Sequence, residues 1–393
     1  MNLSATPFDF DKEVVRRGTA CYKWDEPERD DIIPMWVADM DFTAAPCILA
    51  ALRRRLDHGV FGYEKVPPAF YDSLTNWFAT RHHWQIDPSS VLYTTGVVPA
   101  LSAIIKALAQ PRDRVLVLTP VYNCFFSSIR NNGCEVEECP LVVGDNGLYA
   151  IDFADMERRA ARPDVTVMLM CNPHNPGGRV WTPEELAKVA DVCRRHDVAL
   201  VSDEIHCELV LRPGLHYTPM AVVAPGEVIS CVSPSKSFNT AGLHVSAIVC
   251  PDTALRGRID RALNINEVCD VNPFGVEAFI AAYREGAPWI DALCRYLWDN
   301  YLTLLHHFEA ALPALPVMPL EGSYLAWVDI RSTGLSSDTV TARLLEQARV
   351  MVNSGTMYGA AGEGYIRLNL ATRRTLIAEA LQRITPVLQE MGG

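Results

Sequence analysis

Three short apolar runs in this sequence each end at a group of polar side chains, and this pattern constrains the fold. The runs cover residues 165–170, 199–201 and 228–232. The polar side chains that follow them include Asn175, Asp203, His206 and Lys236. Such runs predict buried strands, and in a parallel α/β sheet ligands bind at the carboxyl ends of the strands. We therefore expect an amide, an acid, an imidazole and an amine to lie close together at one edge of a sheet.

The chemical interpretation depends on Lys236, which stands just past a predicted buried strand, with Ser233 and Ser235 before it. One interpretation is a lysine that reaches into water, because lysine is rarely buried. The other is a desolvated amine whose pKa falls low enough for it to attack a carbonyl. Pyridoxal phosphate (PLP) is used with such an amine, and it needs a carboxylate near its pyridine nitrogen, for which Asp203 is the candidate. Asn175 can supply the donor that the phenolate oxygen needs.

Three motifs with the spacing found here resemble those of the aspartate-aminotransferase superfamily, fold type I of the PLP enzymes. They are Asn-Pro-x-Asn-Pro-x-Gly at 172–178, Ser-Asp-Glu-Ile-His at 202–206 and Ser-x-Ser-Lys at 233–236. Within that superfamily, residues 33–42, 61–63 and 174–181 resemble the cystathionine β-lyase or C–S lyase branch. The resemblance implies an α/β fold, with a mostly parallel central sheet flanked by helices in a large domain and a smaller α+β domain.

The length of 393 residues favours more than one domain, because single cores rarely grow beyond about 250–300 residues. We expect an N-terminal arm and small-domain segment at 1–47, a large PLP-binding domain at 48–286 and a C-terminal small domain at 287–393. Apolar spacing predicts helices at 100–109, 183–196, 287–311, 337–349 and 374–391, and strands at 115–118, 323–329 and 364–370. The strand–helix–strand order around residues 165–201 predicts a parallel crossover.

The resemblance assigns roles around the cofactor. Lys236 becomes the residue that carries PLP and acts in catalysis, Asp203 pairs with the pyridine nitrogen, and Asn175 and His206 lie near the phenolate oxygen. Tyr122 stacks on the ring. The implied phosphate contacts are Gly96, Val97, Val98, Ser233, Ser235 and, from the partner subunit of a homodimer, Tyr63. Read from the residues alone, Tyr63 is more often a packing residue than a ligand, and Tyr122 is not distinguished from a core aromatic residue. The glycine is then a helix cap and the histidine a backbone-bonded side chain.

One position departs from the pattern. Aminotransferases of this superfamily often have a phosphate-binding arginine eight residues after the lysine, and this chain has His244 there. The departure leaves more of the phosphate's charge to hydroxyls and backbone amides, and it sets the chain apart from typical aminotransferases.

An arginine in a predicted buried strand, Arg367, is the candidate for binding the substrate. A buried charge is costly unless it is paired. A purely structural role for Arg367 would be an ion pair with an acid such as Asp329. A guanidinium also matches a carboxylate with two hydrogen bonds. The resemblance favours that second role, on the α-carboxylate of an amino acid. It further places Val37, Ala38, Tyr122, Asn175 and Tyr358 near the substrate, although Tyr358 could equally be a turn residue.

These residues predict a PLP-dependent C–S β-lyase that cleaves cystathionine or related S-substituted cysteines to a thiol, pyruvate and ammonia. A class I/II aminotransferase is the alternative, because it needs the same lysine, acid and arginine. A PLP-binding regulatory protein is a minority alternative.

Composition excludes several other classes of function. A net charge of -12 argues against nucleic acid or an anionic membrane as partner. No apolar run approaches the roughly 20 residues of a membrane span. The 12 cysteines are scattered with no C-x-x-C pair, which favours reduced thiols and no metal site. The acidic amino terminus does not resemble a signal peptide, so a cytoplasmic location is expected.

Overall fold

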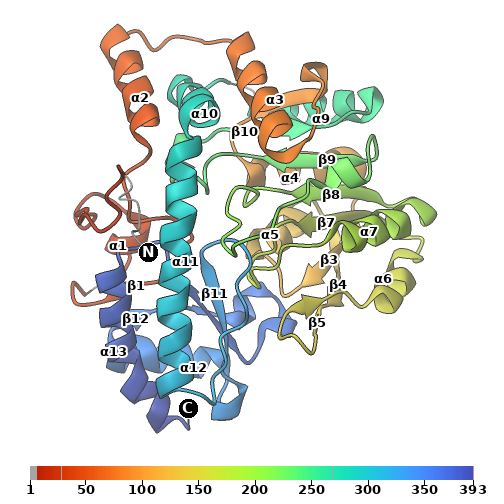
Figure 1. Cartoon of the computed structure of the whole chain (residues 1–393). Coiled ribbons are helices and arrows are strands. Elements are labelled where there is room, and N and C mark those ends of the chain that lie inside the picture. Colours follow the sequence, from red (N-terminus) through yellow and green to blue (C-terminus); the bar gives the residue numbers. More distant parts are fainter. Residues whose placement is uncertain (1–6, 28, 269, 393) are drawn as a thin grey trace.

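The computed structural model describes residues 7–27, 29–268 and 270–392, and a seven-stranded sheet lies at its centre (Figure 1). The strand order is β2-β10-β9-β8-β7-β3-β4. All neighbouring pairs from β9 to β4 are parallel, and only β10 runs against both of its neighbours. The strands are β2 (Val91–Thr94), β3 (Arg114–Thr119), β4 (Glu135–Pro140), β7 (Val165–Cys171), β8 (Ala199–Asp203), β9 (Val228–Val232) and β10 (Ser246–Val249). The predicted, mostly parallel α/β sheet is confirmed.

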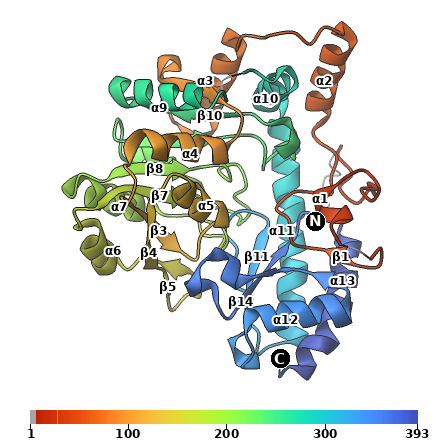
Figure 2. The ribbon, with the colours of Figure 1, turned by 180° about the vertical axis from the view of Figure 1, so that it is seen from behind.

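Helices cover both faces of this sheet, as Figure 2 shows from behind. Alternate strand residues such as Val117 and Val201 pack against one helical layer, and their neighbours Leu116 and Leu200 pack on the opposite face. The first layer contains α4 (Val97–Leu108), α5 (Asn123–Asn131) and α9 (Thr253–Ile265). The second face is covered by α3 (Pro68–His82), α6 (Phe153–Ala160), α7 (Pro183–Arg195), α8 (Met220–Val223) and α10 (Pro273–Glu285). Burial on both faces explains why these strands read as continuous apolar runs.

Local signals in the sequence set several element ends. Helix α7 starts at the predicted place, because Thr182 and Glu185 form a reciprocal capping box. Helix α2 (Pro46–His58) stops at Gly59, which takes the left-handed conformation with φ 72°. The predicted helix at 337–349 is too long: α12 (Ser337–Arg343) gives way to a π-helical turn at Leu344–Ala348.

The remaining elements form a second, smaller group around a three-stranded antiparallel sheet of order β11-β14-β13. The strands are β11 (Leu325–Asp329), β13 (Asn353–Ser354) and β14 (Tyr365–Asn369). Helix α11 (Ala287–Ala311) runs from the large sheet's helices to this group, and α13 (Arg374–Glu390) closes it (Figure 1). A hairpin of β5 (Val142–Val143) and β6 (Tyr149–Ala150) lies beside β4.

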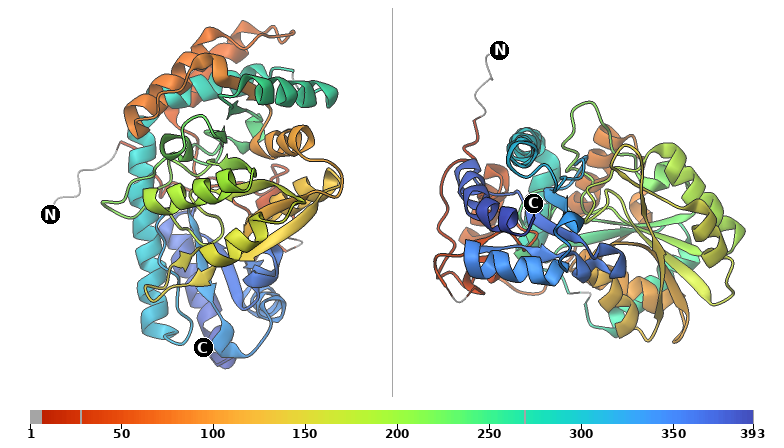
Figure 3. Two further views of the ribbon diagram at one scale, coloured as in Figure 1. Left: turned by 90° about the vertical axis from the view of Figure 1, so that its right-hand side faces the viewer. Right: turned by 90° about the horizontal axis from the view of Figure 1, so that it is seen from below.

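The N-terminal arm packs against the C-terminal elements (Figure 3). Its strand β1 (Ile33–Pro34) pairs in parallel with β12 (Val350–Met351), so that Ile33 lies opposite Val350. A short helix, α1 (Tyr22–Asp25), precedes β1. The division into domains at residues 47 and 286 stays a prediction.

No helix in the described ranges is both long and apolar enough to cross a bilayer. The eleven cysteines in these ranges are free thiols, and most of them are buried. The twelfth, Cys269, lies outside the described residues.

Candidate active site

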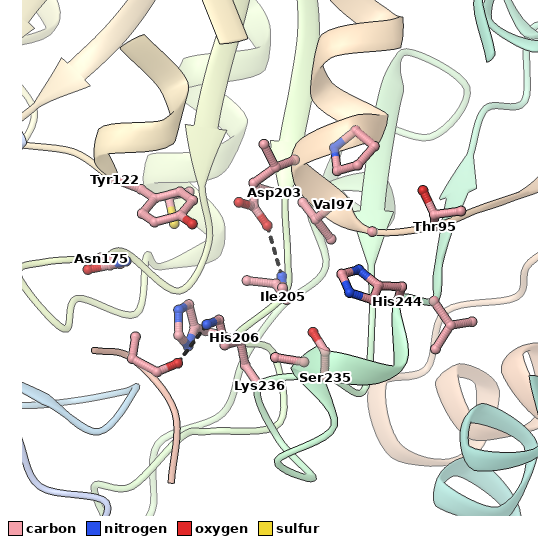
Figure 4. Close-up of a pocket in the computed structure, with 17 residues that line it drawn as sticks. Thr95, Val97, Tyr122, Asn175, Asp203, Ile205, His206, Ser235, Lys236 and His244 are labelled. Atoms are coloured by element: carbon pink, nitrogen blue, oxygen red, sulfur yellow. Dashed lines mark hydrogen bonds between the residues drawn. The ribbon is translucent and has the colours of Figure 1, made fainter. Parts of the chain in front are cut away.

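A cavity of about 310 Å³ opens at the carboxyl ends of β7, β8 and β9 (Figure 4). The residues that line it are Ala38, Thr95, Gly96, Val97, Val98, Pro99, Tyr122, Cys171, Asn175, Asp203, Ile205, His206, Ser235, Lys236, Ala241, His244 and Val245. Every predicted cofactor residue except Tyr63 and Ser233 is among them. The expectation that the polar groups after the three strands converge therefore agrees with the structure.

Lys236 lies in the turn after β9, and its Nζ donates a hydrogen bond to the backbone oxygen of Ala38 at 2.6 Å. Burial lowers the pKa of this amine, while the charge of Asp39 raises it and that of Arg367 lowers it. The net direction is downward. The interpretation of a lysine that reaches into water is wrong, because its amine bonds to a backbone oxygen at the cavity, and a lowered pKa favours the neutral form that a nucleophile or general base needs.

Asp203 is the last residue of β8 and is only 2% exposed. Its Oδ1 accepts a hydrogen bond from the backbone amide of Ile205 at 3.1 Å (Figure 4). Burial raises the pKa of this carboxyl to about 7, although that hydrogen bond favours the charged form. A buried acid of this kind is suited to a positively charged partner within the cavity.

His206 and Asn175 face the cavity from the loops after β8 and β7. Burial, with the charges of Lys236 and Arg367, lowers the pKa of His206 to about 3, so the ring is neutral. Its Nδ1 has no hydrogen-bond partner among the described residues, which leaves no support for a backbone-bonded histidine at that atom. Asn175 accepts from Arg367 Nη1 through its Oδ1 at 3.2 Å, so its amide NH₂ remains a donor.

Arg367 lies in β14, opposite Trp327, and is 3% exposed. Besides Asn175, its guanidinium donates to the backbone oxygen of Trp36 at 2.8 Å and lies 4.9 Å from the ring centroid of Tyr358. The alternative of an ion pair with Asp329 is wrong, because that acid pairs with the neighbouring Arg331. Nε of Arg367 has no partner within the described residues. A buried guanidinium held only by neutral groups is a candidate carboxylate site.

The opposite end of the cavity has the character of an anion site. Helix α4 begins at Val97, directly after Gly96, so the amides of Val97 and Val98 lie in its first turn, where helix amides lack intrahelical partners. Ser235 and His244 lie on this side of the cavity in Figure 4.

Five predicted residues lie outside the lining of the cavity, and Arg367, described above, is one of them. Ser233 is buried and donates its hydroxyl to Val245 O at 2.8 Å, so in this structure it supports the turn. Tyr358 is buried over Arg367, and its hydroxyl accepts from Asn353 at 2.9 Å. Val37 contributes its backbone oxygen to a hydrogen bond from Asn369 at 2.5 Å. Tyr63 is 98% exposed.

The donors in this cavity fit PLP. The Lys236 amine is suited to react with the aldehyde of PLP, and the buried Asp203 carboxyl is suited to bind its protonated pyridine nitrogen. The free NH₂ of Asn175 is suited to donate to its phenolate oxygen. The first amides of α4, together with Ser235, suit a phosphate.

Sequence reasoning missed several residues that build the site. Thr95, Cys171, Ile205, Ala241 and Val245 line the cavity. Tyr324 donates to Ala38 O at 3.0 Å, although the sequence suggested no more than an alternating strand there. Asn369 is the last residue of the quoted Tyr-x-Arg-x-Asn pattern, so its place in a motif was the available signal. It holds the oxygens of both Val37 and Asp39.

Comparison with known proteins gives consistent matches over nearly the whole chain. A family model described as aminotransferase class I and II matches residues 30–384. The cystathionine β-lyase PatB of Bacillus subtilis is 40% identical over 387 residues, which cover 97% of this chain and 100% of PatB. The crystal structure of cystalysin from Treponema denticola contains pyridoxal 5'-phosphate. It matches this structure with a TM-score of 0.93 and 31% identity, over 98% of this chain and 99% of cystalysin. The PLP-bound C–S lyase of Staphylococcus hominis has a TM-score of 0.91 and 32% identity, with 98% of this chain and 99% of that chain covered.

Proposed function

The chain belongs to the aminotransferase class I and II family, and from this premise we propose that it is a PLP-dependent C–S β-lyase. Its substrates are cystathionine or other S-substituted cysteines, and its products are a thiol, pyruvate and ammonia. The observation that carries the proposal is one cavity in which Lys236, Asp203 and Asn175 meet, with Arg367 bonded to Asn175 at its wall. An aminotransferase needs the same groups, so these residues do not distinguish the two activities. We favour the lyase because the similar proteins are named as C–S lyases.

When bound, PLP supplies an aldehyde for an amine and a ring that takes up electrons from the substrate's α-carbon. Arg367 binds the α-carboxylate of the amino acid and orients its α-carbon. Lys236, as a neutral amine, takes the α-proton as general base. Asp203 holds a proton at the pyridine nitrogen, and the Tyr122 ring excludes water from one face of the site. The Cβ–S bond then breaks, and the sulfur leaves as a thiol with the proton that Lys236 removed. Water adds to the C=N carbon of the remaining three-carbon imine, whose C–N bond breaks to give pyruvate and ammonia.

The reaction class is tested by supplying the purified, PLP-loaded chain with cystathionine and with cysteine. Free thiol and pyruvate are measured together, with and without a keto-acid acceptor. We expect equal amounts of pyruvate and thiol without any acceptor. Turnover that requires the acceptor and releases no thiol would instead identify an aminotransferase.

We also propose that the active site is completed by a second copy of the chain. Leu56, Val60, Phe61 and Tyr63 are 59%, 62%, 52% and 98% exposed, and they lie close together at the end of α2 and in the segment that follows it. Exposed apolar residues concentrated in this way are typical of interaction surfaces. In the proposed homodimer, Tyr63 reaches the phosphate end of the partner's cavity. The buried free thiols favour a cytoplasmic location for this dimer.

Mixing two impaired variants, at a PLP concentration too low to saturate Tyr63→Ala, tests the dimer. Tyr63→Ala is expected to weaken PLP retention by about tenfold to a hundredfold, because a hydrogen bond to a charged group is lost. Unfolding and refolding it together with Lys236→Ala creates hybrids in which one site has both residues intact. Equal mixing should restore about a quarter of the wild-type activity, since half of the dimers are hybrids with one good site.

In the matched control, Tyr22→Ala is mixed with Lys236→Ala in place of Tyr63→Ala. Tyr22 is also an exposed tyrosine, at 64%, but lies elsewhere on the chain. That variant is expected to keep its own activity and to gain nothing from mixing. If the Tyr63→Ala mixture shows no gain over the sum of its parts, Tyr63 does not cross to a partner's site.

A further inference from the structure

A short segment of the N-terminal arm contacts both cations of the active site. The backbone oxygen of Ala38 accepts from Lys236 Nζ at 2.6 Å, and that of Trp36 accepts from Arg367 Nη2 at 2.8 Å. The position of this segment therefore affects the amine and the guanidinium together.

Four charged side chains, here called the arm cluster, hold this segment. They are Arg16, Lys23, Asp39 and Asp41. Arg16 donates to both oxygens of Asp39 at 3.0 and 2.6 Å and to Asp41 at 2.9 Å. Lys23 is 1% exposed, donates to Asp41 at 2.9 Å and lies 3.8 Å from Asp39. With two cations and two anions, the cluster is neutral as a whole. Its Lys23 ammonium is shielded from solvent.

Asp39 is the member of the cluster that directly follows Ala38, the residue whose backbone oxygen accepts from Lys236. Burial lowers the pKa of the Lys236 amine, and Asp39 is the anion that opposes this most strongly, ahead of Asp203. The other charged or titratable groups that face the amine come from α5, β14, the strand end of β8 and the residue before β11. They are Cys124, Arg367, Asp203, His206 and Tyr324, whose hydroxyl shares the Ala38 oxygen.

We propose that the arm cluster is a positioning device that sets the proton affinity of the Lys236 nitrogen, with Asp39 as the member that acts on it. This inference rests on the proposed function, in which Lys236 carries PLP. The amine has to accept a proton and later release it, which is most efficient when its affinity for that proton matches the working pH. Burial by itself lowers the proton affinity of the amine. The Asp39 charge and the Ala38 oxygen offset part of that effect.

The two charges of the Arg16–Asp39 pair predict opposite effects. Asp39→Asn leaves the cluster with one excess positive charge, so the Lys236 nitrogen should lose its proton at lower pH. Arg16→Gln leaves one excess negative charge, so the nitrogen should keep its proton to higher pH. Damage to the fold would not shift the pH of deprotonation in opposite directions, because it would impair both variants in the same way.

The test is a pH titration of the visible absorption of the PLP-loaded full-length chain, which reports the proton on the nitrogen that carries PLP. The midpoint should fall by about one pH unit in Asp39→Asn and rise by about one unit in Arg16→Gln. Arg16→Lys keeps the charge and is expected to titrate close to the wild type.

Arg17→Gln is the matched control. Arg17 is the next residue on the same arm and has a similar side-chain exposure, 23% against 20% for Arg16, but it donates to the backbone oxygens of Trp24 and Ile32. Its midpoint should not move. Should Arg16→Gln not fold, Lys23→Gln removes a positive charge from the same cluster and is expected to shift the midpoint upward.

Two outcomes overturn the inference: shifts in the same direction for the Asp39 and cation variants, or shifts no larger than that of Arg17→Gln. A wild-type chain that gains no visible band with PLP overturns the proposed function itself. A wild-type chain with a normal band and unmoved variant midpoints overturns only the role of the arm cluster.

Discussion

Lys236→Ala is expected to lower kcat for thiol and pyruvate release by about 10⁴-fold, because one nitrogen both carries PLP and takes the α-proton. The variant should also lose PLP on desalting, which the visible absorption of the desalted protein measures. Added methylamine should restore part of the turnover, since a free amine can enter the space left by the side chain and act as a base.

The matched control is Lys106→Ala. Lys106 lies on α4 and donates to Asn266 at 2.9 Å, away from the cavity. We expect wild-type kcat and PLP content for it. Substantial turnover in Lys236→Ala, or an equal loss in Lys106→Ala, would contradict the role of Lys236.

Asp203→Asn is expected to lower kcat by about 10²–10³-fold, a magnitude typical of removing one buried group that stabilises developing charge. The amide has nearly the same shape but cannot hold a proton at the pyridine nitrogen. Thiol release by the PLP-loaded variant measures the effect. The control is Glu204→Gln, the next residue, which is also buried but accepts from Ser202 and from the Met220 amide, outside the cavity lining. A loss as large in Glu204→Gln would show that the Asp203 effect is not specific.

The pH dependence of the free energy of unfolding shows whether Asp203→Asn loses activity because the protein is less stable. Burial raises the pKa of Asp203 from 3.8 to about 7 in the folded chain, so the folded state binds this proton more tightly than the unfolded state does. As pH rises between these two values, the unfolded chain ionises first, and the free energy of unfolding falls by about 1.4 kcal/mol per pH unit. Above the folded value the loss is complete.

Asp203→Asn removes this cost. Without PLP, the variant is therefore expected to unfold at a higher temperature than the wild type near about pH 8, with a smaller gap near about pH 5. Thermal unfolding of the PLP-free proteins at the two pH values measures the gap. A variant that is less stable than the wild type near the higher pH would contradict burial as the cause of the raised pKa.

The sequence predicted the part of the site that depends on strand ends. Asn175, Asp203 and Lys236 each follow a buried apolar run, and parallel pairing alone brings such ends to one edge of a sheet. Arg367 was also predictable, because a charge inside an apolar strand requires a partner or a ligand.

Other features were not predictable because they depend on tertiary contacts. The Ser233 hydroxyl turns toward Val245 O, which sequence spacing cannot specify in a turn. The helix predicted at 337–349 changes to a π-helical turn at Leu344–Ala348, and Arg349 ends that turn with a left-handed φ of 58°, after which Val350 pairs with Ile33. The arm cluster was not predicted, because its members lie up to 25 positions apart in an arm without regular periodicity and meet only through tertiary contacts.

The pairing of β1 with β12 also affects how the protein is made. The ribosome releases Ile33 more than 300 residues before its strand partner Val350. Domains that emerge first generally fold first. Here the loops around Lys236 can form while translation continues, whereas the oxygen that receives its amine is fixed in place only when the carboxyl-terminal strands arrive. A nascent chain therefore cannot complete the surroundings of Lys236 until Val350 has been made and has paired with Ile33.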